Sequence, residues 1–235
     1  MAEKFEELLE MYRRLFLMVD AFHFNSQNTA DVYRRYLEIP EKSKVIPITH
    51  SDIDDHRKQR KYDERVLTLG FIGSEAPFKG LPMLKDVIGK LNEAGYKERV
   101  RLNVYGGRVG LDDSLNNVFY KGKFASSKMA HVFDDMDILV VPSICYETFS
   151  FVTLEALSFG TVVIVSDKVG AKDLVRRYAP EFIFDTKDDL LSMLNLLVID
   201  RTSLKKYQEN LLKDDWKYSI QEHSRMIVEQ LYKRV

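Results

Sequence analysis

The chain has 235 residues, of which 45% are hydrophobic and 30% charged, so it is long enough for one large domain with a substantial core. Its 35 basic and 36 acidic residues nearly cancel, and a net charge of −1 excludes any general attraction for nucleic acid. The single cysteine, Cys145, excludes an intrachain disulfide and is typical of a reducing, cytoplasmic compartment. No apolar run reaches the roughly 18 residues that a membrane-spanning helix needs.

The first 62 residues predict an extension made of helices and short strands. Residues 3–19 have the apolar spacing of an amphipathic helix, whose acidic start favours packing against protein over peripheral contact with a membrane. Three further elements are expected: a strand at 21–25, a helix from Ser26 to about Leu37, and a strand at 44–48. The polar segment 49–64 predicts a linker, and we interpret its basic run, 56–61, as a solvated surface.

From residue 65 onward, strands alternate with helices. Apolar runs predict strands at 66–72, 100–105, 117–120, 138–141, 161–165 and 182–184. Helices are expected at about 80–94, 126–135, 149–159, 170–177, 186–198, 202–213 and 216–233. Apolar strands separated by helices indicate an α/β fold with a Rossmann-like, doubly wound parallel sheet. We therefore predict a domain over 63–203, followed by C-terminal helices over 204–235.

Such sheets bind ligands at the carboxyl ends of their strands. The loops expected at this end are 73–80, 106–110, 122–126, 143–150 and 166–173. Since parallel strands place these ends along one edge of the sheet, the loops should converge on one crevice.

The segment from Pro142 to Ala156 has the strongest functional signal. Glu147 and Glu155 lie eight positions apart, and the apolar strand before them leads into a helix N-terminus, which can bind an anion. Glu155 is expected about two helical turns in, roughly 10 Å along the axis from Glu147. An anion flanked by two carboxylates is the layout needed to hold a sugar, a diphosphate and a ribose in a row.

This segment resembles the Glu-x7-Glu motif of retaining glycosyltransferases with the GT-B fold, most closely those of family 4. The usual form is Pro-Ser-x-x-Glu-x-Phe-Gly-x-x-x-x-Glu-Ala, and Ser150 here replaces the Gly. The resemblance covers about residues 20–235 and implies the donor-binding, C-terminal half of such an enzyme. It implies transfer of a sugar from a nucleotide diphosphate sugar, for example a UDP- or GDP-sugar, with retention of anomeric configuration. It also implies that no metal or other cofactor is required.

The resemblance also implies roles for residues of the motif. Glu147 would hydrogen-bond the transferred sugar, and Glu155 would accept both ribose hydroxyls. The start of the helix would bind the diphosphate or sugar through Thr148, Phe149, Ser150 and Phe151. A solvated helical acid is the alternative for Glu155, although its neighbours in the sequence are apolar.

The loop from Gly73 to Gly80 resembles the family's Gly-Arg-x-x-x-x-Lys-Gly segment. Lys79 would neutralise the departing diphosphate, which Gly80 lets the backbone approach. Ser74 stands where the family has an arginine, so either its hydroxyl or another basic residue would have to compensate. A surface lysine in an ordinary turn is the alternative.

Two further turns resemble parts of the family's site. The nucleotide base would lie near Gly106, Lys123 and Phe124, although a glycine at a strand end is more often a simple turn. Asp173 stands where the family has a glutamate, and an acid that complements the helix dipole explains it equally well.

The acceptor domain that the resemblance implies is largely missing from this sequence. We therefore expect either an excised fragment or a second polypeptide that supplies the acceptor half. A glycan or lipid-linked acceptor in polysaccharide or glycolipid synthesis is the commonest setting of such sequences. The alternatives are a binding subunit without activity and a GT-B epimerase or hydrolase that acts on a nucleotide sugar.

Overall fold

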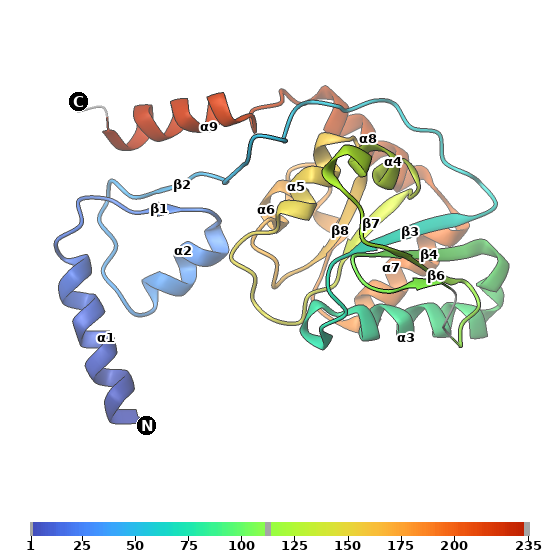
Figure 1. Ribbon diagram of the computed structural model, residues 1–235, viewed down its shortest axis with the longest axis horizontal. Coiled ribbons are helices and arrows are strands. Elements are labelled where there is room, and N and C mark those ends of the chain that lie inside the picture. The colour runs from blue at the N-terminus through green and yellow to red at the C-terminus, as the bar shows by residue number, and fades with distance from the viewer. Residues whose placement is uncertain (1, 111–113, 233–235) are drawn as a thin grey trace.

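The structure, a computed structural model, describes residues 2–110 and 114–232 (Figure 1). Its main sheet has seven strands in the order β5-β6-β4-β3-β7-β8-β9. These are β3 (Leu67–Ile72), β4 (Val100–Tyr105), β5 (Val109–Gly110), β6 (Val118–Gly122), β7 (Ile138–Val141), β8 (Val162–Ser166) and β9 (Ile183–Phe184). Only β5 runs antiparallel to its neighbour; the other pairs are parallel. The predicted α/β fold with a doubly wound parallel sheet is confirmed.

Helices cover both faces of this sheet. They are α3 (Leu81–Leu91), α4 (Met129–Asp134), α5 (Phe151–Ser158), α6 (Lys172–Arg176), α7 (Lys187–Ile199) and α8 (Thr202–Lys213). Helices α3 and α7 lie on one face, while α4, α5 and α8 lie on the other (Figure 1). Every residue of β7 and β8 is buried, because helices cover these strands from both sides. This burial explains why the strands appear in the sequence as unbroken apolar runs.

Several of the predicted helices end or begin elsewhere than expected, and two of them pass into π-helical turns. The helix expected at 80–94 stops at Leu91 and continues as a π-helical turn, Asn92–Tyr96, in which Gly95 has a φ of 91°. The helix expected at 216–233 begins only at Ile220, as α9 (Ile220–Ile227), and passes into a π-helical turn, Val228–Tyr232. Residue 233 lies outside the described residues.

The N-terminal extension forms a small second layer of its own. It contains α1 (Ala2–Phe16), β1 (His23–Phe24), α2 (Gln27–Arg34) and β2 (Lys44–Val45). Strands β1 and β2 pair in parallel through the crossover helix α2, and both are shorter than predicted. Helix α9 crosses back to this layer (Figure 1), where His223 Nδ1 lies 3.0 Å from the carbonyl oxygen of Pro47.

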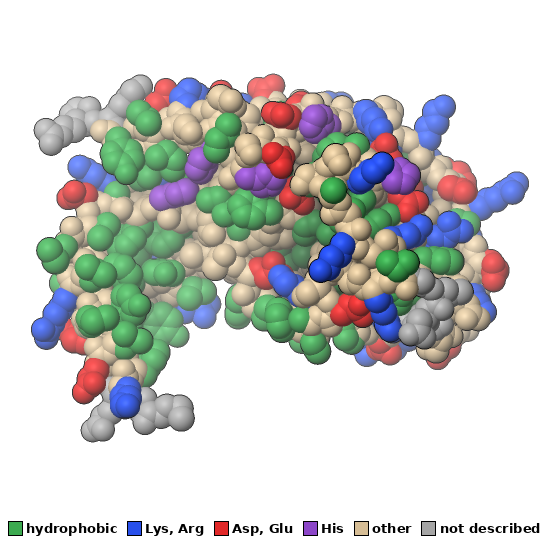
Figure 2. Space-filling model, viewed as in Figure 1, with side chains coloured by type: hydrophobic (Ala, Val, Ile, Leu, Met, Phe, Trp, Pro, Cys, Tyr) green, Lys and Arg blue, Asp and Glu red, His purple; other side chains and the backbone are tan. Residues whose placement is uncertain are grey.

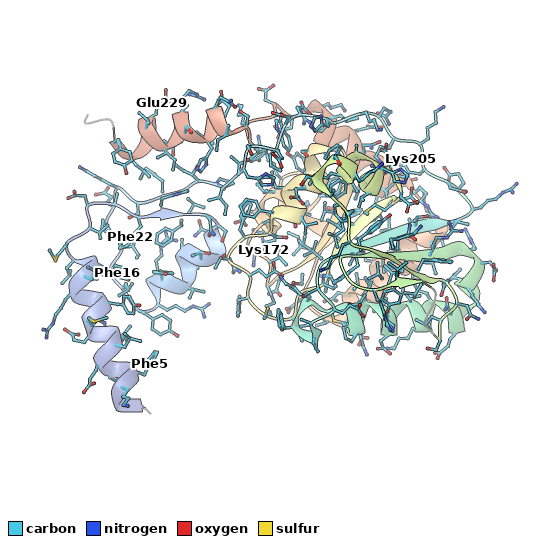
Figure 3. All side chains as sticks on the ribbon, viewed as in Figure 1. Phe5, Phe16, Phe22, Lys172, Lys205 and Glu229 are labelled. Atoms are coloured by element: carbon cyan, nitrogen blue, oxygen red, sulfur yellow. The ribbon has the colours of Figure 1, made fainter. Side chains whose placement is uncertain are left out.

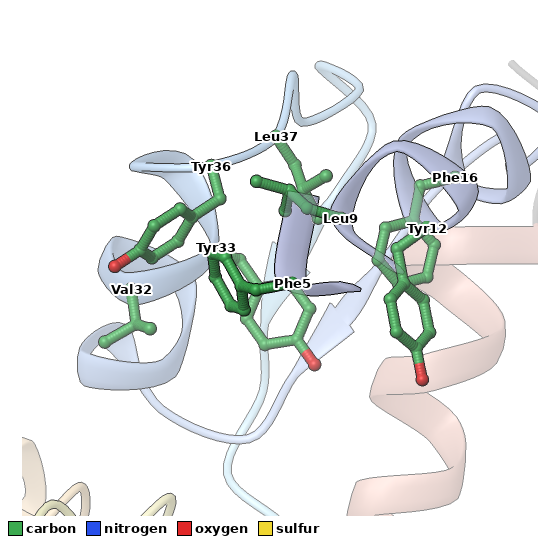
Figure 4. Close-up of a pocket in the computed structure, with 8 residues that line it drawn as sticks. All are labelled: Phe5, Leu9, Tyr12, Phe16, Val32, Tyr33, Tyr36 and Leu37. Carbon is green, nitrogen blue, oxygen red and sulfur yellow. The ribbon is translucent and has the colours of Figure 1, made fainter. Parts of the chain in front are cut away.

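An apolar groove lies between α1 and α2, and we call it the α1–α2 groove. Its volume is about 400 Å³, and Figure 4 shows its lining residues: Phe5, Leu9, Tyr12, Phe16, Val32, Tyr33, Tyr36 and Leu37. The ring of Phe16 packs edge-on against Phe22 at 5.1 Å, which joins α1 to the strand layer (Figure 3). Phe5 is nevertheless 55% exposed, and hydrophobic side chains gather over this part of the surface (Figure 2).

The segment 49–64 forms no helix or strand, as a linker should, but two arginines of its basic run are not solvated. The side chain of Arg57 is only 7% exposed and donates to the carbonyl oxygens of Leu211 and Asp214 at the end of α8. Arg60 donates to the Thr161 hydroxyl at 2.8 Å and to the carbonyl oxygens of Phe133 and Met136 at the end of α4. The interpretation as a solvated surface is wrong for these two residues, because both guanidinium groups bind backbone oxygens at helix ends, where cations are stabilising; the other residues of the run are exposed as expected.

Among the helices of the described residues, none combines the length and the hydropathy needed to cross a bilayer.

Candidate functional site

The loops after β3 and β7 meet at the carboxyl edge of the sheet. The Ile144 amide donates to the Phe78 carbonyl oxygen at 2.9 Å, which joins the loops directly. Gly80 has a φ of 81°, and a Cβ atom there would lie 1.7 Å from the carbonyl oxygen of Pro142. Glycine is therefore required at this position for two reasons, the left-handed backbone and the close approach of the loop 142–150 after β7, which we call the motif loop.

A lysine–carboxylate pair lies where these loops meet. Lys79 Nζ is 2.9 Å from Glu147 Oε1, and the hydroxyl of Ser143 donates to the same carboxylate. The two charged side chains are 35% and 15% exposed, so bulk water screens their interaction only in part. A cavity of about 60 Å³ adjoins the pair and is also lined by Gly73 and Ser150. The structure thus brings Gly73 and Lys79 of one predicted segment together with Glu147 and Ser150 of the other.

Helix α5 begins two residues later than predicted. Ser150 has an extended backbone with φ 176° and ψ 100°, so the first helical residue is Phe151. Ser150 precedes the helix, but its side chain forms no capping hydrogen bond. The first backbone N–H groups of α5 can therefore donate hydrogen bonds to an anion. Glu155 is the fifth helical residue, only about 6 Å along the axis from Phe151. The predicted position two turns into the helix was wrong.

Glu155 is half-buried and has a partner that the sequence did not reveal. His50 Nε2 lies 3.2 Å from Glu155 Oε1, although the two residues come from distant parts of the chain. Burial raises the pKa of Glu155, and the neighbouring His50 acts in the opposite direction. Glu155 is therefore no freely solvated helical acid.

The extension contacts the motif loop through Thr148. The carbonyl oxygen of Thr148 accepts from the Ser26 hydroxyl at 2.6 Å and from the Thr29 hydroxyl at 3.1 Å. Ser26 also caps α2 by accepting from the Thr29 amide at 3.1 Å. The next residue, Phe149, is buried and packs edge-on against Phe151. The helix cap at Ser26 was predicted, but its contact with the motif loop was not.

The residues expected to surround a base lie at the ends of β4 and β6. Gly106 has a φ of 104°, and a Cβ atom there would lie 2.6 Å from the carbonyl oxygen of Gly73. Phe124 is half-buried and packs edge-on against Tyr105, while Lys123 is exposed. Backbone packing thus explains why glycine is needed at position 106, whether or not a base binds nearby.

The remaining two predicted positions can also be located. Ser74 is exposed, and the loop after β4 contributes Arg108, whose Nε lies 3.3 Å from Oε2 of the adjacent Glu75. A basic residue is therefore close to the position where the family has arginine. Asp173 lies in the first turn of α6, where an acid complements the helix dipole. Its carboxylate pairs with Arg176 at 2.8 Å and accepts a hydrogen bond from the backbone N–H of Gln27 at 3.3 Å.

Across the residues that the structure describes, no group of three or more His, Cys, Asp or Glu side chains is arranged to hold a metal ion.

The sheet, its converging loops and the open start of α5 define the class of this protein. It is an α/β protein with the Rossmann-like half of a GT-B fold. The sequence profile of the glycosyl transferases group 1 matches residues 66–198, more than half of the chain. The chain belongs to this family.

Solved structures of several proteins share this fold. HepE of Anabaena in complex with UDP and glucose superposes with a TM-score of 0.72 at 18% identity, over 96% of this chain and 67% of that one. Sucrose-phosphate synthase from Thermosynechococcus elongatus gives 0.67 at 19% identity, over 97% and 61%. WaaG, a glycosyltransferase involved in lipopolysaccharide biosynthesis, gives 0.64 at 18% identity, over 88% and 62%. The chain thus spans about two thirds of these proteins' lengths. A search of curated proteins found no match.

Proposed function

We propose that this chain binds a nucleotide diphosphate sugar and supports transfer of the sugar with retention of configuration, as in family 4. The observation that supports this most directly is the Lys79–Glu147 pair beside the uncapped start of α5. The chain's membership of the glycosyl transferases group 1 family agrees with this proposal. HepE, a structural neighbour, has been solved with UDP and with UDP-glucose.

In this proposal the diphosphate binds between Lys79 and the start of α5. Lys79 exchanges its contact with Glu147 for the phosphate oxygens, and the backbone N–H groups at Phe149, Ser150 and Phe151 bind the remaining charge. Positioned cations and dipoles stabilise a leaving diphosphate without having to reorganise, so this arrangement lowers the barrier to its departure. In this proposal these groups bind the diphosphate without a metal ion.

The same binding mode assigns the two carboxylates to the two sugars of the donor. Glu147, once released by Lys79, accepts hydrogen bonds from the transferred sugar. Glu155 accepts the ribose hydroxyls, since a carboxylate has lone pairs for both. The base then lies towards the ends of β4 and β6, near Gly106, Lys123 and Phe124.

The acceptor-binding half is proposed to cover the α1–α2 groove. Strands β1 and β2 form a parallel sheet of only two strands, and the helices beside it leave the apolar α1–α2 groove open. Because parallel sheets are normally covered by further elements on both faces, we expect another part of a protein to cover this region. The matched structures are longer than this chain, so the cover would come from such an additional part or from a separate polypeptide. A glycan or lipid-linked acceptor and a cytoplasmic location, with peripheral membrane contact, complete the proposal.

Calorimetric titration with UDP, GDP, dTDP, ADP and CMP tests this function. We expect selective binding of one diphosphate, and loss of that binding in Glu155→Ala. Sugar transfer that appears only when a candidate acceptor-domain polypeptide is added would support a split enzyme. Donor hydrolysis by the chain alone would instead indicate a hydrolase, and absence of binding to any nucleotide would argue against the donor role.

A further inference from the structure

His50 is held beside Glu155 in one defined tautomer. Its Nδ1 accepts the backbone N–H of Asp52 at 3.3 Å, so the ring proton of the neutral imidazole must be on Nε2. Nε2 points at Glu155 Oε1, 3.2 Å away, and therefore donates to the carboxylate. The ring also packs edge-on against Phe151, the first residue of α5, at 5.3 Å between centroids.

The backbone on both sides of His50 is anchored. The Thr49 hydroxyl donates to the Tyr218 carbonyl oxygen at 2.5 Å, which joins the segment to the residues before α9. Ile53 is 1% exposed, belongs to the main core, and donates its amide to the His50 carbonyl oxygen at 3.1 Å. The imidazole is thus presented to Glu155 by a segment that lies outside the sheet.

This contact matters for Glu155 because burial acts against its charged form. Burial raises the pKa of Glu155, and a protonated carboxyl group would be a poorer acceptor for two hydroxyls. A donor at Oε1 stabilises the carboxylate and fixes its plane. An ionised carboxylate has about four lone-pair sites, so one bond from His50 leaves room for a vicinal diol.

We propose that His50 is a positioning residue that holds Glu155 ionised and oriented for the ribose of the donor nucleotide. This inference rests on the proposed function. It means that the segment 49–64, and not only the sheet, determines how the nucleotide is recognised.

The test compares the affinities for UDP and GDP with those for their 2′-deoxy forms, because their ratio reports the ribose contact directly. The wild type should prefer the ribonucleotide by about tenfold, the value of roughly one good hydrogen bond. His50→Phe keeps a ring against Phe151 but removes the N–H donor. We expect the preference to fall to about two- to threefold while affinity for the deoxynucleotide stays within about twofold.

Two variants make this result specific. His50→Gln restores an N–H donor and should restore most of the preference for ribose. His56→Phe is the matched control, since His56 stacks on Phe159 at the other end of α5 and does not contact Glu155. It should leave both affinities unchanged.

The inference is overturned if His50→Phe keeps the full preference for the ribonucleotide. It is also overturned if His50→Phe lowers the affinities for the ribo- and the deoxynucleotide equally, as loss of a packing contact alone would. Glu155→Ala separates this outcome from failure of the proposed function. If Glu155→Ala removes the preference and His50→Phe does not, only the role of His50 is refuted. If the wild type shows no preference for ribose, the proposed role of Glu155 fails, and that of His50 fails with it.

Discussion

Replacing Lys79 with methionine should weaken binding of a nucleoside diphosphate far more than binding of the free nucleoside. In the free site Lys79 neutralises Glu147 across 2.9 Å, and the two side chains are only 35% and 15% exposed. Lys79→Met removes the cation that would contact the phosphates. It also leaves an unpaired carboxylate beside the position where the diphosphate must bind.

The magnitude follows from these two effects. A charge-assisted hydrogen bond contributes roughly 1.5–3 kcal/mol, but the bound lysine gives up its contact with Glu147, so the net gain lies at the lower end. Repulsion adds to the loss, since unit charges 4 Å apart interact by about 4 kcal/mol at an effective dielectric constant of 20 and less with solvent exposure. We expect a total loss of about 2–3 kcal/mol, or about 30- to 150-fold in affinity.

The assay is calorimetric titration with UDP, and with uridine by competition, for Lys79→Met, Glu147→Gln and the double variant. Because the double variant lacks the unpaired carboxylate, it should recover about tenfold of the affinity that Lys79→Met loses. Uridine should bind all four proteins within about twofold. Equal losses for UDP and uridine would refute the phosphate role, and strictly additive losses would refute the coupling to Glu147.

Three further predictions concern stability and pH. Gly80→Ala should lower the free energy of unfolding by about 3 kcal/mol or more, because it combines a positive φ with a clash against backbone, whereas Gly95→Ala, with open space around it, should cost only about 1–2 kcal/mol in urea titrations. Ser26→Ala and Ser219→Ala each remove a helix cap worth about 1 kcal/mol, but only Ser26→Ala should also weaken UDP binding, since only Ser26 contacts the motif loop; equal binding would contradict this. Burial raises the pKa of Glu155, so the folded state binds more protons, and stability should fall as the pH rises above about 4.3, the ordinary value. Glu155→Gln should remove this decrease in urea titrations between about pH 4 and 7, and an unchanged slope would contradict it.

The sheet could be predicted because burial on both faces leaves its mark in consecutive residues. β7 is the clearest case, since all of Ile138–Val141 are apolar and all are buried. Helix boundaries were less certain, because Phe149 and Ser150 have side chains compatible with a helix but lie in extended or irregular backbone before α5. The packing of Gly170 against the Thr148 carbonyl oxygen, which holds that backbone in place, is not visible in the sequence.

The candidate site could be predicted only as far as its motifs reach. Lys79 and Glu147 were identified because each lies in a recognisable loop, and parallel strands bring such loops together. His50 was missed because it lies 105 positions from Glu155, in a segment whose composition indicates a linker. Arg57 was misjudged for the same reason: the carbonyl oxygens that bind it belong to the end of α8, far along the chain.

The contacts that were missed share a feature that bears on how the site works. Residues 66–198 contain both glutamates of the motif, yet Ser26 and His50, which contact Thr148 near its start and Glu155 at its end, lie outside that range. The motif loop and α5 are therefore fixed by Ser26 and His50 of the N-terminal extension as well as by the sheet. A displacement of the extension, for instance when a partner covers the α1–α2 groove, would move Ser26 and with it the Thr148 carbonyl beside the proposed diphosphate site. The proposed binding of a partner at the groove would therefore act on the proposed donor site through the hydrogen bonds from Ser26 and Thr29 to the Thr148 carbonyl oxygen. This effect can be measured separately from that of the His50–Glu155 contact by comparing Ser26→Ala with His50→Phe.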